Sequence, residues 1–486
     1  MKISFKKSVC MNRIFFSYSV IVCAITMSLI GSVAVAQDTL PINKEDMVAL
    51  TKPSVVRIAQ HVKGTATIPA ITIDLKHWSV AIDTSQPAQT VPVDEVLSGS
   101  GFVVSTDGYI VTNSHVVSLQ TTKMDVMTNM VLPAMYDGAL ALNEDETKKV
   151  FQDEIATFEF SKKVFEFVSA HSSFDVTQDI AVLNPSSHKE KLDELIAEGF
   201  PVRIVSVNDH FYDDGKDVAL IKIEQDNLPT VSLGTSDLIN VGKQVSLFGF
   251  PSTAEFNQHN PLESTFTQGN ISALKDSENK DFKVFQTDAK VSEGSSGGPL
   301  VDDDGTVLGI VTFQTDQLQK NSGDNFAFAI PIEMAQKMID DTGVHIQPSE
   351  YQSQLQQGMQ AMQSKRCASA LTAFDRAHDK NTSFEVSRYT DPYRARCQLL
   401  LASGQSVDTL QSRVQSFFTE MSLSLRLITG IIILFSLSLV CMMWWLVREV
   451  HKEEDEIHVL EKRLRDEDKQ ISADHKLIEK LSKKKT

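Results

Sequence analysis

The stretch EGSSGGPL at residues 293–300 restricts the fold more than any other part of the sequence. Glycine residues stand on both sides of Ser296, so the backbone can form a tight turn that presents the serine hydroxyl. In such a turn the backbone N–H groups of Gly294 and Ser296 can converge on one oxygen atom. The same stretch also fits a plain Gly/Ser turn between two strands. Ser295 is the second choice for the presented hydroxyl, because the Gly-Gly-Pro run follows Ser296 directly.

Short β-type runs divided by turn residues extend on both sides of this turn, from Lys52 to about His345. Examples are GSGFVVS-TDG-YIVTNSHVV, DVALIKIE and GTVLGIVTF, which are separated by Asp-Gly, Gly and Pro. This pattern predicts an antiparallel barrel or sandwich rather than alternating strand and helix units. We therefore expect a mainly β domain over residues 37–345.

Between Val117 and Phe200 the pattern changes to helical spacing. The runs ETKKVFQDEIATFEFSKKVFEFVSAH and SSHKEKLDELIAEG place apolar residues three and four positions apart among charged ones. We interpret residues 118–199 as a mostly helical insertion in the β domain.

Two further strings carry side chains that can activate a serine hydroxyl. A nucleophilic serine needs an imidazole to accept its proton and a carboxylate to orient the imidazole. TNSHVV places His115 after a strand, and DDGKDVALIKIE places Asp217 directly before an apolar strand that would cover it from water. Asp213 and Asp214 are alternatives, but they lie in a polar turn. His115, Asp217 and Ser296 are therefore the candidate catalytic triad.

Five strings resemble the HtrA/Deg branch of the trypsin-like serine proteases, in the same order and over most of residues 52–345. They are GSGFVVSTDGYIVTNSHVV, DVALIKIE, LPTVSLGTSDLINVGKQVSLFGFP, QTDAKVSEGSSGGPLV and FAFAIP. The resemblance implies a chymotrypsin-like fold of two six-stranded antiparallel barrels with the triad in the cleft between them. It also implies that His115 is the general base, Asp217 its orienter and Ser296 the nucleophile, with the Gly294 and Ser296 N–H groups as oxyanion hole.

Three residues near Ser296 depart from the pattern of that family. Lys290 stands where the base of the primary specificity pocket is expected, and a small residue is more usual there. Its ammonium would favour an acidic substrate side chain, unless it turns out to solvent. Glu293 and Ser295 replace the usual proline and asparagine, and a carboxylate at 293 could hinder the oxyanion turn. Because both oxyanion donors are backbone groups, the catalytic interpretation stands.

The insertion and the missing PDZ domain are larger departures. The segment between His115 and Asp217 is far longer than usual in the family, and it lies between elements that frame the cleft. We therefore expect a lid or docking platform, the alternative being a decorated surface loop. No PDZ domain follows the protease region, so regulation through PDZ binding is not carried over.

The start of the chain is typical of a secretory signal. A basic N-terminus and an apolar run over residues 14–33 precede Ala34-Val35-Ala36, the small-residue pattern of a cleavage site. We predict a signal peptide over residues 1–36, the alternative being an uncleaved signal anchor.

A second apolar run, LITGIIILFSLSLVCMMWWLV at residues 427–447, contains no charge and is long enough to cross a bilayer as a helix. Arg426 and Arg448 bracket it, and Trp444 and Trp445 suit an interfacial aromatic belt. We predict a single membrane span, with the protease domain on the periplasmic or exoplasmic side. The tail, residues 448–486, is then cytoplasmic, and its apolar residues at heptad spacing predict a charged helix or weak coiled coil.

Residues 346–420 are predicted to be helical and TPR-like. Gly358, Ala370, Phe374 and Ala377 fall on the small and aromatic positions of a tetratricopeptide unit. The usual tryptophan and final proline are missing, so a simple helical spacer is the alternative.

Cys367 and Cys397 lie in the part of the chain that we expect to be exported. In an oxidising compartment they can form a disulfide. Two buried thiols are the alternative.

The composition excludes one class of partner. The formal net charge of −17 argues against nucleic-acid binding, which needs a basic surface.

The resemblance implies a serine endopeptidase of envelope or misfolded proteins, without a cofactor or metal. The substrate chain is expected to lie extended along the strand near Gly309–Phe313. Because the family often forms trimers, a homotrimer is the expected assembly. The alternative function is a weakly active or inactive protease fold that serves as a membrane-anchored binding module, against which the intact triad argues.

Overall fold

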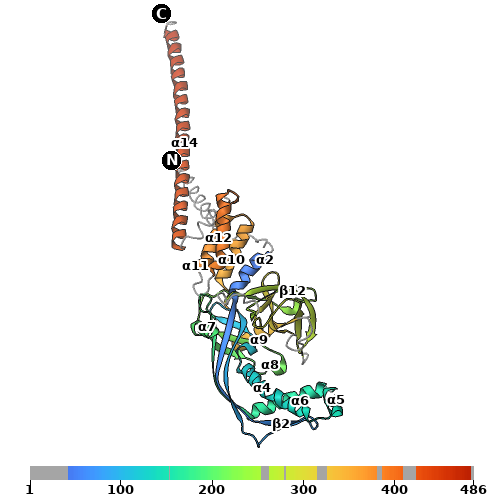
Figure 1. The fold of residues 1–486 in the computed structure, drawn as a ribbon. Helices are drawn as coiled ribbons and strands as arrows, with labels where there is room; N and C mark the ends of the chain where they lie inside the picture. The colour runs from blue at the N-terminus through green and yellow to red at the C-terminus, as the bar shows by residue number, and fades with distance from the viewer. Residues whose placement is uncertain are drawn as a thin grey trace. The chain divides into compact units, whose positions relative to one another are not determined.

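The structure is a computed structural model that describes residues 42–152, 154–252, 262–277, 281–314, 326–379, 386–408 and 423–482 (Figure 1). The predicted signal peptide, residues 1–36, lies outside these residues. The chain divides into two units, Met1–Val407 and Asp408–Thr486, and each is described by itself.

The first sheet forms a closed barrel, in which two short consecutive strands, β7 and β8, together make the closing strand. Its strands are β1 (Val55–Ile68), β4 (Gln89–Val103), β5 (Tyr109–Thr112), β6 (Ser173–Val182), β7 (Phe200–Pro201), β8 (Arg203–Val207) and β9 (Ala219–Lys222). Their order is β7-β6-β1-β4-β5-β9-β8. Between β7 and β8 only Val202 intervenes, and its N–H donates to the Ile180 carbonyl of β6 over 3.0 Å. The two pieces therefore act as one strand that pairs with β6 and β9 and closes a six-stranded barrel.

The second sheet is a closed barrel as well. Its strands are β10 (Ser232–Leu233), β11 (Gln244–Gly249), β12 (Thr265–Asp276), β13 (Lys283–Thr287), β14 (Pro299–Val301), β15 (Thr306–Gln314) and β16 (Ala327–Pro331). The order is β10-β15-β14-β11-β12-β13-β16, and β15 also pairs with β16. That pairing closes six antiparallel strands, and β10 adds to β15 in parallel. The predicted chymotrypsin-like pair of six-stranded barrels is confirmed.

The two barrels share one hydrophobic cluster, which holds them together. It includes Phe102, Val111 and Leu220 of the first barrel and Phe248 and Ile310 of the second. Each of these side chains is at most 1% exposed. Each such side chain contributes about 1.5–3 kcal/mol relative to an exposed one. The relative position of the barrels, and with it any site between them, is therefore fixed by packing.

The predicted mostly helical insertion over residues 118–199 contains four helices, but it also contains one strand of the barrel that was not expected. Helices α3 (Ser114–Val117), α4 (Leu119–Leu140), α5 (Glu144–Gln152) and α6 (Glu154–His171) end before β6, which pairs with β1 in the barrel. After β6, only α7 (Leu192–Glu198) is helical before β7. The first eight residues of SFDVTQDIAV, at 173–182, alternate between exposed and half-buried side chains, which is the period of a strand and not of a helix.

A long β-ribbon, which the sequence did not reveal, supports the helices of the insertion. The distal halves of β1 and β4 run on beyond the barrel, and β2 (Ile71–Asp74) and β3 (Ser79–Ile82) form a small sheet at their tip. In Figure 1 this ribbon leads to α4, α5 and α6. Residues of the ribbon and of α4 and α6 form a separate core that includes Val62, Ile68, Val126, Met127 and Val164. The ribbon and helices are thus one packed extension of the first barrel.

The protease region and the segment after it contain further helices. They are α2 (Lys44–Thr51), η1 (Lys52–Ser54), α8 (Phe211–Asp214), η2 (Ser236–Leu238), α9 (Glu333–Thr342), α10 (Glu350–Gln363), α11 (Cys367–Asp379) and α12 (Ser387–Ala402). In the helical segment, a Cβ atom built on Gly358 would lie 2.3 Å from Phe374 Cε1. The predicted close packing at the small and aromatic positions is therefore present, while the assignment as a TPR-like unit stays a prediction.

Cys367 on α11 and Cys397 on α12 are both completely buried, and no disulfide joins them. Both thiols belong to the hydrophobic cluster of the helical segment. The structure thus has two buried thiols at these positions, and a disulfide in an oxidising compartment stays a prediction.

The second unit contains one long helix, α14 (Leu423–Ser482). By length and composition alone, its portion Leu434–Leu477 contains a stretch that is long and apolar enough to cross a membrane. Apolar side chains in the predicted span, such as Phe435 at 66% and Met443 at 65%, are exposed, and so are the heptad residues Ile457 and Leu464 of the tail. The span and the coiled coil stay predictions.

The Gly358 contact generates a stability prediction. We expect Gly358→Ala to destabilise the folded chain by about 1–3 kcal/mol, because the new methyl group must displace the fully buried Phe374 ring. Thermal unfolding followed by circular dichroism measures the change. The exposed neighbour Gln357→Ala is the matched control and should change stability by less than about 0.5 kcal/mol. Equal melting temperatures for the two variants would contradict the close packing.

Candidate active site

Small polar side chains fix the segment that carries His115 to the neighbouring strand of the first barrel. Asn113 Nδ2 donates to the Asp217 carbonyl over 2.6 Å, and Ser114 Oγ donates to the Val218 carbonyl over 2.7 Å. Both side chains are completely buried. The residues before His115 therefore hold α3 against the start of β9, where Asp217 lies.

The Asp217 carboxylate binds His115 through two atoms. His115 Nδ1 lies 2.6 Å from Asp217 Oδ2, and the His115 backbone N–H donates to Oδ1 over 3.0 Å. The hydroxyl of Thr312 on β15 donates to the same Oδ2 over 2.7 Å. With the carboxylate as acceptor, Nδ1 carries a proton and Nε2 is left as the basic nitrogen.

Burial and the charge of the partner act in opposite directions on both groups. Burial lowers the pKa of His115, but the Asp217 charge and hydrogen bond outweigh it and leave that pKa above its ordinary value. Burial raises the pKa of Asp217, but the His115 charge and the hydrogen bonds from His115 and Thr312 hold that pKa below its ordinary value. Asp217 is therefore ionised at neutral pH and stabilises the protonated imidazole.

Ser296 lies in a turn that only glycine permits at two positions. Gly294 and Gly297 have φ angles of +91° and +86°. A Cβ atom on Gly297 would lie 2.0 Å from the Ser100 carbonyl oxygen. The Ser296 carbonyl accepts from the Ser100 N–H over 2.8 Å, so the turn is also bound to β4 of the first barrel.

The peptide before Gly294 is held in a fixed orientation. The Glu293 carbonyl accepts from the Ser252 N–H over 2.8 Å, and in a trans peptide the following N–H points the opposite way. Ser100 Oγ holds the next carbonyl, that of Gly294, over 2.7 Å. No acceptor is recorded, in the described part of the chain, for the N–H of Gly294 or of Ser296. Two backbone donors beside one serine hydroxyl can stabilise an oxyanion.

The Ser296 hydroxyl is bound to Thr312 in this structure. Ser296 Oγ donates to the Thr312 carbonyl over 2.9 Å, and the described residues include no hydrogen bond between Ser296 and His115. Thr312 thus binds Asp217 with its side chain and Ser296 with its backbone. The three predicted triad residues come together around this one threonine.

The alternative residues have other partners. Asp214 accepts from Asn208 Nδ2 over 2.9 Å, and Asp213 pairs with Lys162 over 3.0 Å. Ser295 is 7% exposed and its Oγ lies 3.5 Å from the Ser292 N–H, so it presents no hydroxyl to the cleft.

Two of the three residues that depart from the family pattern near Ser296 are exposed. The Lys290 side chain is exposed and has no recorded hydrogen bond or ion pair within the described ranges, which fits the solvent-facing alternative. Glu293 is exposed as well, while its carbonyl is held by Ser252. The Glu293 carboxylate therefore does not prevent the oxyanion turn from forming.

The substrate strand expected near Gly309–Phe313 is largely occupied. β15 pairs with β14 at Pro299↔Ile310 and with β16 at Val311↔Ala329, so both edges of the strand are used over its middle. Only its end at Thr312 faces Ser296. Strand addition near Gly309–Phe313 stays a prediction, and the pairing with β14 limits it to the end of the strand after Val311.

Sequence reasoning missed Thr312 and Ser100. Ser100 is completely buried, and its hydroxyl accepts from the Phe250 N–H over 2.9 Å while it donates to Gly294. Thr312 is 4% exposed and stands inside the apolar run GIVTF. A buried hydroxyl in an apolar strand needs a hydrogen-bond partner, so the single threonine in this run is the feature of the sequence that could have indicated its role.

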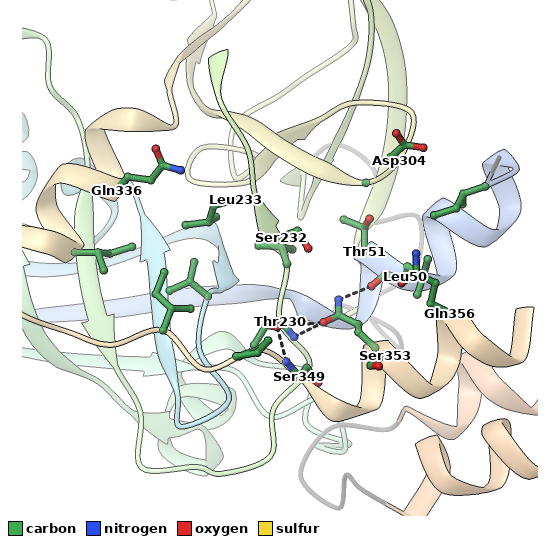
Figure 2. Close-up of a pocket in the computed structure, with 18 of the residues that line it drawn as sticks. Leu50, Thr51, Thr230, Ser232, Leu233, Asp304, Gln336, Ser349, Ser353 and Gln356 are labelled. Carbon is green, nitrogen blue, oxygen red and sulfur yellow. Dashed lines mark hydrogen bonds between the residues drawn. The ribbon is translucent and has the colours of Figure 1, made fainter. Parts of the chain in front are cut away.

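A separate cavity lies away from these residues. It has a volume of about 630 Å³ and lies between α2, α10 and β10 (Figure 2). On its wall, Gln352 accepts from the Thr230 N–H and donates to the Leu50 carbonyl, each over 2.9 Å. Neither His115 nor Ser296 lines it, so the cavity is not part of the candidate triad site.

Comparison with known proteins gives the class. Residues 99–310 match the family described as trypsin-like peptidase domain. A "Probable periplasmic serine endoprotease DegP-like" of Halomonas elongata is 33% identical over 176 residues, 35% of this chain and 35% of the relative. A protein of the same description from Chlamydia pneumoniae is 30% identical over 251 residues, 51% of this chain and 34% of the relative.

The chain spans about a third of the length of these curated relatives. Among solved structures, "HtrA-type protease AlgW with decapeptide" is 20% identical, with coverage of 63% of this chain and 69% of that chain and a TM-score of 0.33. A likeness at that level carries no argument about the site.

The chain therefore carries a trypsin-like peptidase domain. Within that class it is a homologue of the DegP-like serine endoproteases, and the resemblance to the HtrA/Deg branch is confirmed.

The Thr312 hydroxyl generates one prediction. Thr312→Val keeps the backbone carbonyl but removes the hydrogen bond to Asp217, and we expect kcat to fall about tenfold with little change in KM. Thr312→Ser should restore most of the loss because it restores the donor. Steady-state peptide hydrolysis measures both. A positioning role is contradicted if valine and serine behave alike.

The His115–Asp217 pair generates a pH prediction. His115 must be neutral to accept a proton, and its pKa is raised, so kcat/KM should rise with pH along a limb centred above about 6.5. Asp217→Asn removes the raising charge while burial remains. The limb of any residual activity should then move to lower pH, and kcat should fall about 10⁴-fold. A wild-type limb centred below about 6.5 would show that the pair does not act in this way.

Proposed function

We propose that this chain is a serine-type endopeptidase that hydrolyses peptide bonds of proteins outside the cytoplasm, with Ser296, His115 and Asp217 as its triad. The observation that supports the proposal most strongly is the linked set of hydrogen bonds from His115 to Asp217, from Thr312 to Asp217 and from Ser296 to Thr312. Beside it, the N–H groups of Gly294 and Ser296 are available to an oxyanion.

Catalysis begins with a rotation of the Ser296 side chain. Moving Oγ between staggered χ1 positions takes it from the Thr312 carbonyl toward His115 Nε2. A backbone N–H of a bound polypeptide that takes the Thr312 carbonyl would release the hydroxyl for this move. Substrate binding and activation of the nucleophile are then coupled through one acceptor.

The remaining steps follow from the chemistry of the groups. Ser296 Oγ attacks the peptide carbonyl as its proton passes to His115 Nε2, and the Gly294 and Ser296 N–H groups bind the oxyanion. His115 gives that proton to the leaving amine, and the acyl-enzyme forms. Water, activated by His115, then releases the acid and restores Ser296. Asp217 stays ionised throughout and stabilises the imidazolium.

Location and organisation are part of the proposal. The relatives are described as periplasmic, and a signal peptide at residues 1–36 with a span at 427–447 would anchor the protease domain, residues 37–345, on that side of the membrane. Residues 346–420 would form a TPR-like segment between them, and the tail would lie in the cytoplasm. A homotrimer remains the expected assembly by resemblance.

Labelling with a fluorophosphonate tests the proposal. The full chain, purified in detergent, should react at Ser296 and hydrolyse β-casein, and Ser296→Ala should abolish labelling and lower kcat by about 10⁴-fold or more. Ser295→Ala is the matched control and should keep both. If the wild-type chain neither labels nor cleaves, the protease fold serves as a binding module instead.

A further inference from the structure

One face of α4 consists of exposed residues in a single line. Asp125, Asn129, Leu132, Tyr136 and Leu140 are all exposed, with Leu132 at 59%, Tyr136 at 65% and Leu140 at 66%. At about 100° per residue they fall within an arc of about 80° on the helix. We call this line the α4 face.

The opposite side of α4 is already used for packing. Thr122, Val126, Met127 and Val131 are buried against the ribbon and α6. The apolar residues of the α4 face therefore take no part in the packing of this core. Three large apolar side chains in one exposed line are unusual on a surface and are typical of a binding site.

The α4 face begins beside the candidate triad. Thr121 Oγ1 donates to the His115 carbonyl over 2.8 Å, which holds the start of α4 on the catalytic segment. Asp125 follows Thr121 by one helical turn, and burial, then the charge of Glu293, raise the pKa of Asp125. The α4 face therefore begins one helical turn after the residue that binds the His115 segment.

A proline inside α4 leaves one backbone carbonyl on this face without its helical hydrogen bond. Pro133 lies inside α4 and has no N–H, so the Asn129 carbonyl cannot receive its usual helical hydrogen bond. A carbonyl in this position can accept from the N–H of a peptide chain that lies along the face. It provides a polar contact between the acidic and the apolar parts.

We propose that the α4 face is a second binding surface for the polypeptide substrate. It takes a chain with a basic residue near the scissile bond, next to Asp125 and Glu293, and apolar residues farther along, on Leu132, Tyr136 and Leu140. This inference rests on the proposed endopeptidase function and adds a substrate preference to it.

The dimensions determine which substrates reach the surface. From Asp125 to Leu140 the helix extends about 22 Å, which an extended chain covers with about seven residues. A peptide of three or four residues would fill the cleft without reaching the apolar part. Long unfolded chains and short peptides should therefore respond differently to changes in the α4 face.

Charge favours a substrate over a second copy of this chain. The sequence carries a net charge of −17, so an identical partner offers an acidic surface to an acidic pair. A basic, partly apolar unfolded segment relieves the repulsion between Asp125 and Glu293 and covers the apolar line.

The test compares long and short substrates of the full chain in detergent. The triple variant Leu132→Ser, Tyr136→Ser, Leu140→Ser should lower kcat/KM for β-casein about tenfold, equivalent to about 1.4 kcal/mol. The rate with a short peptide p-nitroanilide should be unchanged. Leu399→Ser, on an equally exposed residue of α12, is the control and should leave both rates as in the wild type.

Binding separates this inference from the proposed function. Fluorescent β-casein should bind Ser296→Ala about tenfold more tightly than Ser296→Ala carrying the triple change. That comparison decides the α4 face even if the wild type proves to cleave nothing. Equal casein binding, an equal loss on long and short substrates, or a change only in oligomeric state by light scattering would overturn the inference.

Discussion

The arrangement of the site depends on one buried carboxylate with donors from both barrels. Asp217 precedes β9 of the first barrel, and it accepts from His115 of the same barrel and from Thr312 of β15 in the second. A buried carboxylate is stable as an anion only when such donors satisfy it. Because Thr312 also accepts from Ser296, the barrel contact that satisfies Asp217 places the serine relative to the imidazole.

Much of this could be predicted from sequence because local strings specify it. The glycines around Ser296 and the small polar residues before His115 mark tight turns and buried hydrogen bonds within a few residues of each functional side chain. The bond between Thr312 and Asp217 joins residues 95 positions apart in different barrels. No local pattern reports such a pairing, and a threonine in an apolar strand looks like an ordinary β residue.

The strand β6 inside the insertion could not be predicted for a related reason. β6 alternates exposed and half-buried side chains, but it follows three helices and pairs with β1, whose sequence lies more than 100 residues earlier. The extended ribbon of β1 and β4 could not be predicted from the sequence either, because the helices that bury it follow later in the chain. The insertion is therefore not a detached loop: its first helix is held by the His115 segment and its core is shared with a barrel strand.

With Ser296 as the proposed nucleophile and two backbone N–H groups as the proposed oxyanion donors, the geometry of a trapped adduct is the most direct test. A crystal structure of the full chain after reaction with a phosphonate inhibitor should show phosphorus bonded to Ser296 Oγ. One phosphonyl oxygen should accept from the N–H groups of both Gly294 and Ser296, with His115 still bonded to Asp217. An adduct on another residue, or a phosphonyl oxygen turned away from both N–H groups, would contradict these roles of Ser296, Gly294 and His115.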